Sequence, residues 1–118
     1  MPSMLKLLRL LSDPSRLRVF LLLEREELSV AELQEILSKG QSQISTQLAQ
    51  LKQAGLVEDR RTGKNIFYRL KTPRKADARW MDQLKLTLHG AAAEVPETER
   101  DTEALGLILR KRQDHIRA

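Results

Sequence analysis

The chain contains no cysteine, and this absence excludes several kinds of chemistry. Without thiols there is no disulfide framework, no thiolate-bound metal and no cysteine nucleophile. Histidine occurs only as His89 and His115, and neither lies in a metal-ligand spacing such as His-Glu-x-x-His. The five glycines fall at expected caps, turns or helix interiors rather than in a phosphate-binding loop. We therefore expect no metal site, no cofactor and no enzymatic activity.

Long apolar runs are also missing. The longest, Val19–Leu23, has five residues, far fewer than the roughly 20 that cross a bilayer as a helix. Near the amino terminus Lys6, Arg9 and Asp13 interrupt the leucines, unlike the continuous apolar segment of a secretion signal. The sequence therefore predicts a cytoplasmic protein without a membrane partner.

The size and charge of the chain are more informative. Its 118 residues, 41% of them hydrophobic and 31% charged, predict one folded domain over residues 1–118. The net charge is +5, and residues 56–79 carry the whole excess, with eight basic groups against three acidic ones. A basic patch of this kind attracts a polyanion such as nucleic acid. The alternative is an ordinary solvated surface.

Apolar spacing and capping residues predict helices on both sides of one β-hairpin. Asp13 before Pro14 is a strong helix start, and Ser29 with Glu32 matches a capping box. Gly55 is expected to end a helix in the left-handed region. The expected helices span 4–11, 14–26, 29–37, 41–54, 78–93 and 97–118, and the expected strands 57–61 and 65–70 flank a turn at 62–64.

This order of elements predicts the fold class. The segment 29–55 reads as a helix-turn-helix, the segment 56–71 as a wing, and the segment 78–118 as C-terminal helices. The expected fold is therefore mainly α (α+β): a winged helix-turn-helix with a β-hairpin wing and extra terminal dimerisation helices.

Both terminal helices carry apolar surface that suggests a second copy of the chain. Met4–Leu11 is apolar on nearly all sides. The last helix has an apolar stripe formed by Leu105, Ile108, Leu109 and Ile116. We expect these residues to need a partner, and therefore a homodimer. Two-fold symmetry then predicts an imperfect palindrome as the DNA site.

The helix 41–54 has an outer face of amides and hydroxyls, with Lys52 as its only charge. Amide side chains both donate to and accept from base edges, and glutamine pairs well with adenine in the major groove. In a helix-turn-helix the second helix enters that groove with its N-terminal half. A neutral solvated face is the alternative. The candidate DNA-contacting residues are Gln41, Ser42, Gln43, Ser45, Thr46 and Gln47.

The hairpin adds Arg60, Arg61 and Lys64, long cations that can reach phosphates or a minor groove beside the helix. Gly63 is suited to a tight turn because it tolerates positive φ. A plain solvated hairpin is the alternative. The amide face and the basic hairpin together predict a surface for double-stranded DNA.

Three segments, "LLSDPSRLRVFLLL", "ELSVAELQEIL" and "QSQISTQLAQLKQAGLVEDRRTGKNIFYRL", resemble the ArsR/SmtB family of bacterial winged-helix repressors, in unbroken order over residues 5–70. The resemblance implies a homodimeric transcriptional repressor that leaves its promoter, or changes its grip, when a ligand binds. It implies DNA contacts from the helix residues just named and from the wing at 60–64. One departure is Gln47, where many relatives have histidine.

The resemblance also bears on the effector. Metal sensors of the family carry a Cys-x-Cys pair where this chain reads Ser29-Val30-Ala31-Glu32, so we expect a non-metal signal. The terminal "ALGLILRKRQDHIRA" resembles the linker helix of ArsR-type regulators joined to S-adenosylmethionine-dependent methyltransferase domains. This kinship makes S-adenosylmethionine or S-adenosylhomocysteine an admissible effector. Phe67, Tyr68 and Trp80 are candidate stacking walls, with packing in the core as the alternative.

The sequence as a whole thus predicts a DNA-binding homodimeric repressor modulated by a small non-metal molecule. The alternative is a regulatory or dimerisation module, related to such a methyltransferase fusion, without an operator of its own.

Overall fold

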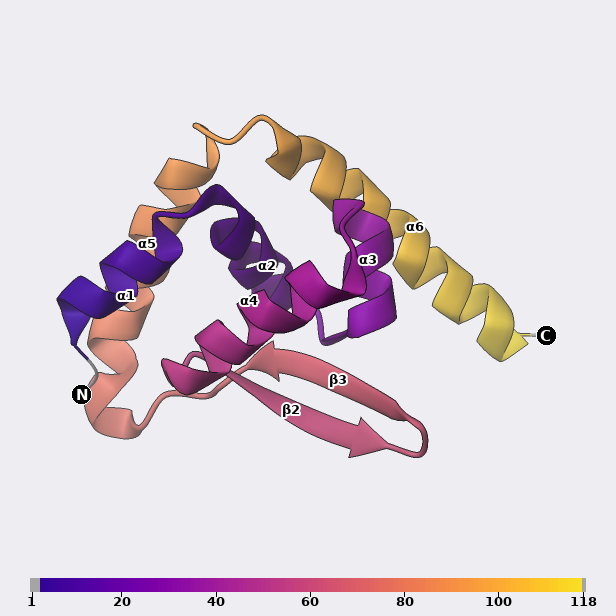
Figure 1. The fold of residues 1–118 in the computed structure, drawn as a ribbon, viewed down its shortest axis with the longest axis horizontal. Helices are drawn as coiled ribbons and strands as arrows, with labels where there is room; N and C mark the ends of the chain where they lie inside the picture. Colours follow the sequence, from indigo (N-terminus) through magenta and orange to yellow (C-terminus); the bar gives the residue numbers. More distant parts are fainter. Residues whose placement is uncertain (1–2, 118) are drawn as a thin grey trace.

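The computed structural model describes residues 3–117; Met1, Pro2 and Ala118, which the predicted domain includes, lie outside this range. Figure 1 shows the helices gathered above a hairpin that extends from one side of the molecule. The elements are α1 (Met4–Leu11), α2 (Pro14–Arg25), β1 (Leu28–Ser29), α3 (Val30–Leu37), α4 (Gln41–Gln53), β2 (Val57–Thr62), β3 (Asn65–Leu70), the short 3₁₀ helix η1 (Lys75–Asp77), α5 (Ala78–Ala92) and α6 (Glu97–Arg117). The predicted winged-helix fold is confirmed.

Local capping explains where two of the helices begin. The Asp13 carboxylate accepts from the backbone N–H of Ser15 at 2.8 Å and of Arg16 at 3.3 Å, which fixes the start of α2. At α3 the Ser29 hydroxyl accepts from the Glu32 N–H at 3.2 Å, and the Glu32 carboxylate accepts from the Ser29 N–H at 3.0 Å. These contacts complete the predicted capping box.

The sheet differs from the prediction in two ways. It has three antiparallel strands in the order β1-β3-β2, because Leu28 and Ser29 pair with Tyr68 and Phe67. The expected turn over 62–64 is also one residue too long, since Thr62 still pairs with Asn65. Only Gly63 and Lys64 remain in the turn, and Gly63 has a φ of 60°. A positive φ at only the first position of a two-residue hairpin loop is typical of a type II′ turn, which has glycine there.

One hydrophobic core joins the helices to the sheet. Its buried side chains come from helices α1 to α6 and from the sheet. In α4 the spacing of four and three residues directs one stripe inward, as predicted. The most buried large side chains are Leu7, Val19, Phe20, Leu28, Leu33, Ile44, Leu48, Leu51, Leu56 and Val57.

Helix α6 packs across α2 and α3 of its own chain (Figure 1). Leu105 and Ile108 are only 3% and 6% exposed in the single chain, and Leu109 is half-buried. The expectation that this stripe needs a partner chain is therefore wrong for these residues, because α2 and α3 already cover them. Ile116, the last member of the stripe, is exposed.

A buried ion pair fastens the first half of α6 to α2. The Arg18 guanidinium donates to both carboxylate oxygens of Asp101, at 2.7 and 2.8 Å, and both residues are buried. Bidentate geometry of this kind satisfies two charges that would otherwise be costly to bury. The hydrogen bond to Asp101 raises the pKa of Arg18 above its usual value.

Candidate nucleic-acid interface

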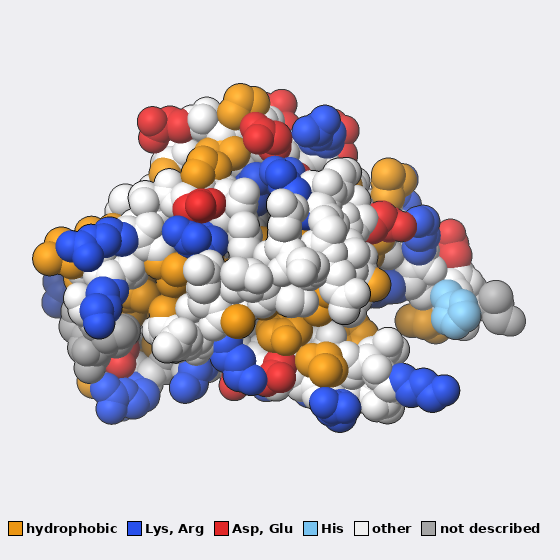
Figure 2. All heavy atoms as spheres, viewed as in Figure 1, with side chains coloured by type: hydrophobic (Ala, Val, Ile, Leu, Met, Phe, Trp, Pro, Cys, Tyr) orange, Lys and Arg blue, Asp and Glu red, His pale blue; other side chains and the backbone are white. Residues whose placement is uncertain are grey.

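Helix α4 is held by its inner stripe and exposes the face that the sequence analysis singled out. Ile44, Leu48 and Leu51 are buried against the rest of the protein. Figure 2 shows the uncharged surface that results over α4, with basic side chains along the lower edge of the molecule. Of the predicted contact residues, Gln47 is half-buried and the following are exposed: Gln41, Ser42, Gln43, Ser45 and Thr46.

The hydrogen bonds within α4 rank these candidates. The Thr46 hydroxyl donates to the Ser42 carbonyl at 2.9 Å, so it is partly engaged by its own helix. Gly40 occupies the N-cap position without a side-chain cap, which leaves N–H donors of the first turn open. Gln43 is exposed in the N-terminal half of α4, where a recognition helix meets the bases. Its amide is therefore a candidate for contact with a base edge.

The beginning of α2 extends this face. A cavity of about 350 Å³ lies where α2 meets α4, and Gln43 and Gln47 form part of its wall together with Ser15, Arg16 and Lys39. The Arg16 Nη1 donates to the Gln50 amide oxygen at 3.3 Å, although the two residues are 34 positions apart. Ser15, Arg16 and Lys39 are therefore additional candidate interface residues that were not predicted from the sequence. The available signal was the positive charge of Lys39, two residues before the start of α4.

The wing presents two faces of different character. Side chains alternate along a strand, so Asp59 and Arg61 share one face of β2 and Arg60 lies on the other. An ion pair of 3.0 Å between Lys52 of α4 and Asp59 identifies the face directed toward α4. The hydrogen bond from Lys52 lowers the pKa of Asp59. Arg61 therefore lies on the α4 side of the wing.

Arg60 is engaged on the opposite face. It forms an ion pair with Glu27, its Nη1 donates to the Thr62 hydroxyl at 2.7 Å, and its guanidinium lies 5.8 Å from the centroid of the Phe67 ring. The hydrogen bond from Arg60 lowers the pKa of Glu27 below its usual value. Arg61 and Lys64, in contrast, have no ion-pair partner among residues 3–117. Of the predicted wing cations, these two are available to phosphates.

The candidate stacking residues do not line a common cavity. Phe67 and Tyr68 are adjacent in β3 and so lie on opposite faces of the sheet. Trp80 of α5 lies in a separate groove beside Leu56, where its indole N–H donates to Asp77 at 3.0 Å. This hydrogen bond lowers the pKa of Asp77. The three aromatic residues are thus placed as parts of different contacts.

The described residues form neither a metal-binding cluster nor a membrane-spanning helix. Within residues 3–117, no three side chains of the metal-binding types (His, Asp or Glu here) come together in a group that suits a metal ion. None of the helices described in that range combines the length and the apolarity needed to cross a bilayer.

Comparison with known proteins assigns the chain to a family. A sequence profile described as "Bacterial regulatory protein, arsR family" matches residues 13–59, from the cap of α2 into β2. The transcriptional repressor BigR from Xylella fastidiosa, whose crystal structure is known, is 41% identical to this chain in sequence. It aligns over 72% of this chain and 82% of BigR, with a TM-score of 0.58. The chain belongs to the ArsR family.

Two other similar proteins are informative. The arsenic resistance transcriptional regulator ArsR1 of Pseudomonas putida is 46% identical over 71 residues, which are 58% of this chain and 56% of ArsR1. The chain thus spans just over half the length of such curated relatives. A homodimeric winged helix-turn-helix DNA-binding domain, Mb0332 from Mycobacterium bovis, is 27% identical. The alignment covers 70% of this chain and 74% of that domain, with a TM-score of 0.59.

Proposed function

We propose that this protein is a DNA-binding transcriptional repressor, in which α4 reads bases and the wing holds the phosphate backbone. The observation that carries the proposal is the pairing of two surfaces: the uncharged amide face of α4 and the wing cations, with Arg61 on the adjoining side of the wing and Lys64 in its turn. Amides suit base edges, and lysine and arginine suit phosphates. The related BigR is described as a transcriptional repressor. Such a role belongs to the cytoplasm.

We further propose that the protein acts as a homodimer through α1 and α5. Both helices lie at one end of the molecule (Figure 1), and both expose leucines: Leu5 is 67% and Leu86 is 71% exposed. The domain of Mb0332 is described as homodimeric. Two-fold symmetry would set the two copies of α4 about 34–36 Å apart, one turn of the duplex, on an imperfect palindrome.

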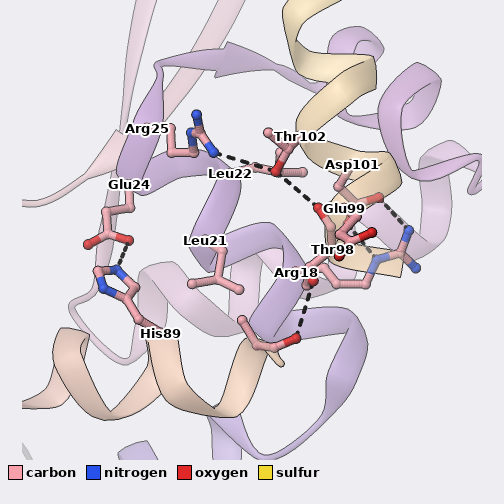
Figure 3. Close-up of a pocket in the computed structure, with 11 residues that line it drawn as sticks. Arg18, Leu21, Leu22, Glu24, Arg25, His89, Thr98, Glu99, Asp101 and Thr102 are labelled. Carbon is pink, nitrogen blue, oxygen red and sulfur yellow. Dashed lines mark hydrogen bonds and ion pairs between the residues drawn. The ribbon is translucent and has the colours of Figure 1, made fainter. Parts of the chain in front are cut away.

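The effector in this proposal is a small non-metal molecule, because the chain has no cysteine to bind a soft metal. A cavity of about 500 Å³ between α2, α5 and α6 has the size of a small-molecule site. In Figure 3, Leu21 lies between the His89–Glu24 hydrogen bond of 2.7 Å and the Arg18–Asp101 pair. S-adenosylmethionine and S-adenosylhomocysteine are the first compounds to test there.

The test is selection of duplexes from a randomised pool by the purified protein, followed by fluorescence anisotropy on the selected duplex and a scrambled one. The proposal predicts binding to the selected palindrome at least about a thousandfold tighter than to the scrambled duplex at fixed salt. Adding either S-adenosyl compound should change that affinity. Equal affinity for both duplexes would favour the alternative, a regulatory module without its own operator.

A further inference from the structure

Arg112 of helix α6 lies against the wing. Its Nε donates to the Glu32 carboxylate at 2.8 Å, and its Nη2 donates to the Glu27 carbonyl at 2.9 Å. Its guanidinium also lies 5.8 Å from the centroid of the Phe67 ring. Arg112 therefore contacts the start of α3, the residue before β1 and the middle of β3 simultaneously, from a position 80 residues away from Glu32.

The Phe67 ring has a second arginine near it. Arg60 of β2, paired across the ladder with Phe67, lies at the same distance of 5.8 Å from its centroid. Arg60 is itself held by Glu27, so Glu27 contacts Arg60 through its carboxylate and Arg112 through its carbonyl. The face of the wing turned away from α4 is thus occupied by a connected set of contacts, which we call the brace: Glu27, Glu32, Arg60, Phe67 and Arg112.

The charges of the brace are well satisfied. Burial raises the pKa of Glu32, but the hydrogen bonds from Arg112 and Ser29 outweigh it, so that the pKa lies below its usual value. Glu32 also completes the capping box of α3. The hydrogen bond to Glu32 raises the pKa of Arg112. The half-buried Arg112 is therefore held in one orientation by its charged partner Glu32. Its neighbour Lys111 is exposed and pairs with the exposed Glu35 at 3.3 Å.

The hairpin needs such support because it extends away from the helices (Figure 1). A two-stranded ribbon is marginally stable alone. The tip residues Arg61 and Lys64 sit beyond the part of the ladder where β1 pairs with β3. Loss of the brace would leave the fold in place but widen the range of positions the tip samples, so that holding a phosphate would cost more entropy.

From this arrangement we propose that Arg112 is a positioning residue, through which α6 orients the wing by contacting Phe67 and Glu32. Arg112 lies on the face opposite to α4 and touches no DNA itself. The inference deepens the proposed function and rests on it for its effect on binding, but the ordering of the wing can be measured without DNA.

The experiment compares Arg112→Gln with Lys111→Gln, its matched control, since both remove one positive charge from adjacent positions of α6. Arg112→Gln should bind the selected and the scrambled duplex about fivefold to tenfold more weakly, while the salt dependence keeps its slope because no phosphate contact is lost. Amide hydrogen exchange at 65–70 should become faster. Lys111→Gln should match the wild type in both measurements.

Phe67→Leu should reproduce the Arg112→Gln effect, and the double variant should be no worse than either single one, because both break the same contact. Phe67→Tyr, which keeps the ring, should behave as the wild type. Equal hydrogen exchange at 65–70 in Arg112→Gln and Lys111→Gln would overturn the proposal. Absence of any DNA binding by the wild type would instead refute the proposed function, and the exchange measurement would still decide the role of Arg112.

Discussion

Helix α4 and the wing adjoin each other, yet they expose opposite chemistry. The outward face of α4 consists of amides and hydroxyls, whereas the wing tip carries Arg61 and Lys64. Uncharged amides gain little from a phosphate but discriminate between base edges, while cations bind any phosphate regardless of sequence. In the proposed function, α4 therefore provides the sequence preference and the wing provides affinity for any duplex. Changes to each should therefore have separable effects.

The largest expected effect comes from a change that disables both regions together. Leu86→Glu places a charge on the exposed face of α5 and should turn the dimer into monomers. A monomer has one α4 and one wing, so affinity for the palindrome should fall by about a hundredfold or more, since the two half-sites no longer act together. Light scattering and anisotropy measure the two effects.

The matched control is Leu107→Glu on α6, where the leucine is 56% exposed. This variant should remain dimeric and bind normally. A dimeric Leu86→Glu with native affinity would remove α5 from the interface.

A second change tests whether α4 provides the sequence preference. Gln43→Ala removes an exposed amide from the N-terminal half of α4, and where that amide makes a bidentate contact we expect a loss of about 1–3 kcal/mol on the selected duplex. Affinity for the scrambled duplex should stay within about twofold, because phosphate contacts are untouched. Anisotropy titrations on both duplexes measure the difference. An equal loss on both would count against base reading by Gln43.

Much of this surface was predictable because its determinants are local. The Asp13 and Ser29 caps act within three residues, and the stripe Ile44, Leu48, Leu51 fixes which side of α4 faces outward. Residue type and helical period then leave the amides on the other side. The elements of the winged helix and its amide face followed from the sequence for this reason.

Long-range pairings were not predictable. Strand β1 exists only because Leu28 meets Tyr68 some 40 residues later, and two residues carry no period of their own. The same holds for the ion pair of Arg60 with Glu27, because no local pattern brings together two residues that lie so far apart in the chain. Leu105 and Ile108 are buried because α6 packs against α2 and α3. An apolar stripe in the sequence does not specify which surface will cover it.

The smallest expected effect comes from the wing. Arg61→Gln should weaken binding to both duplexes by the same modest factor, and it should lower the slope of log affinity against log salt by about 0.9, the value for one lost phosphate contact. Arg60→Gln is the matched control: its guanidinium is engaged by Glu27, so the slope should remain that of the wild type. Salt titrations measure both. Equal slopes for Arg61→Gln and the wild type would remove Arg61 from the contact surface.

The most direct test of the division between α4 and the wing is one salt series of wild-type affinities for the selected and the scrambled duplex. The account predicts two nearly parallel lines of log affinity against log salt. Their common slope reflects phosphate contacts, and their constant separation of at least about three log units reflects base reading by α4. Two lines that coincide throughout the series would contradict it.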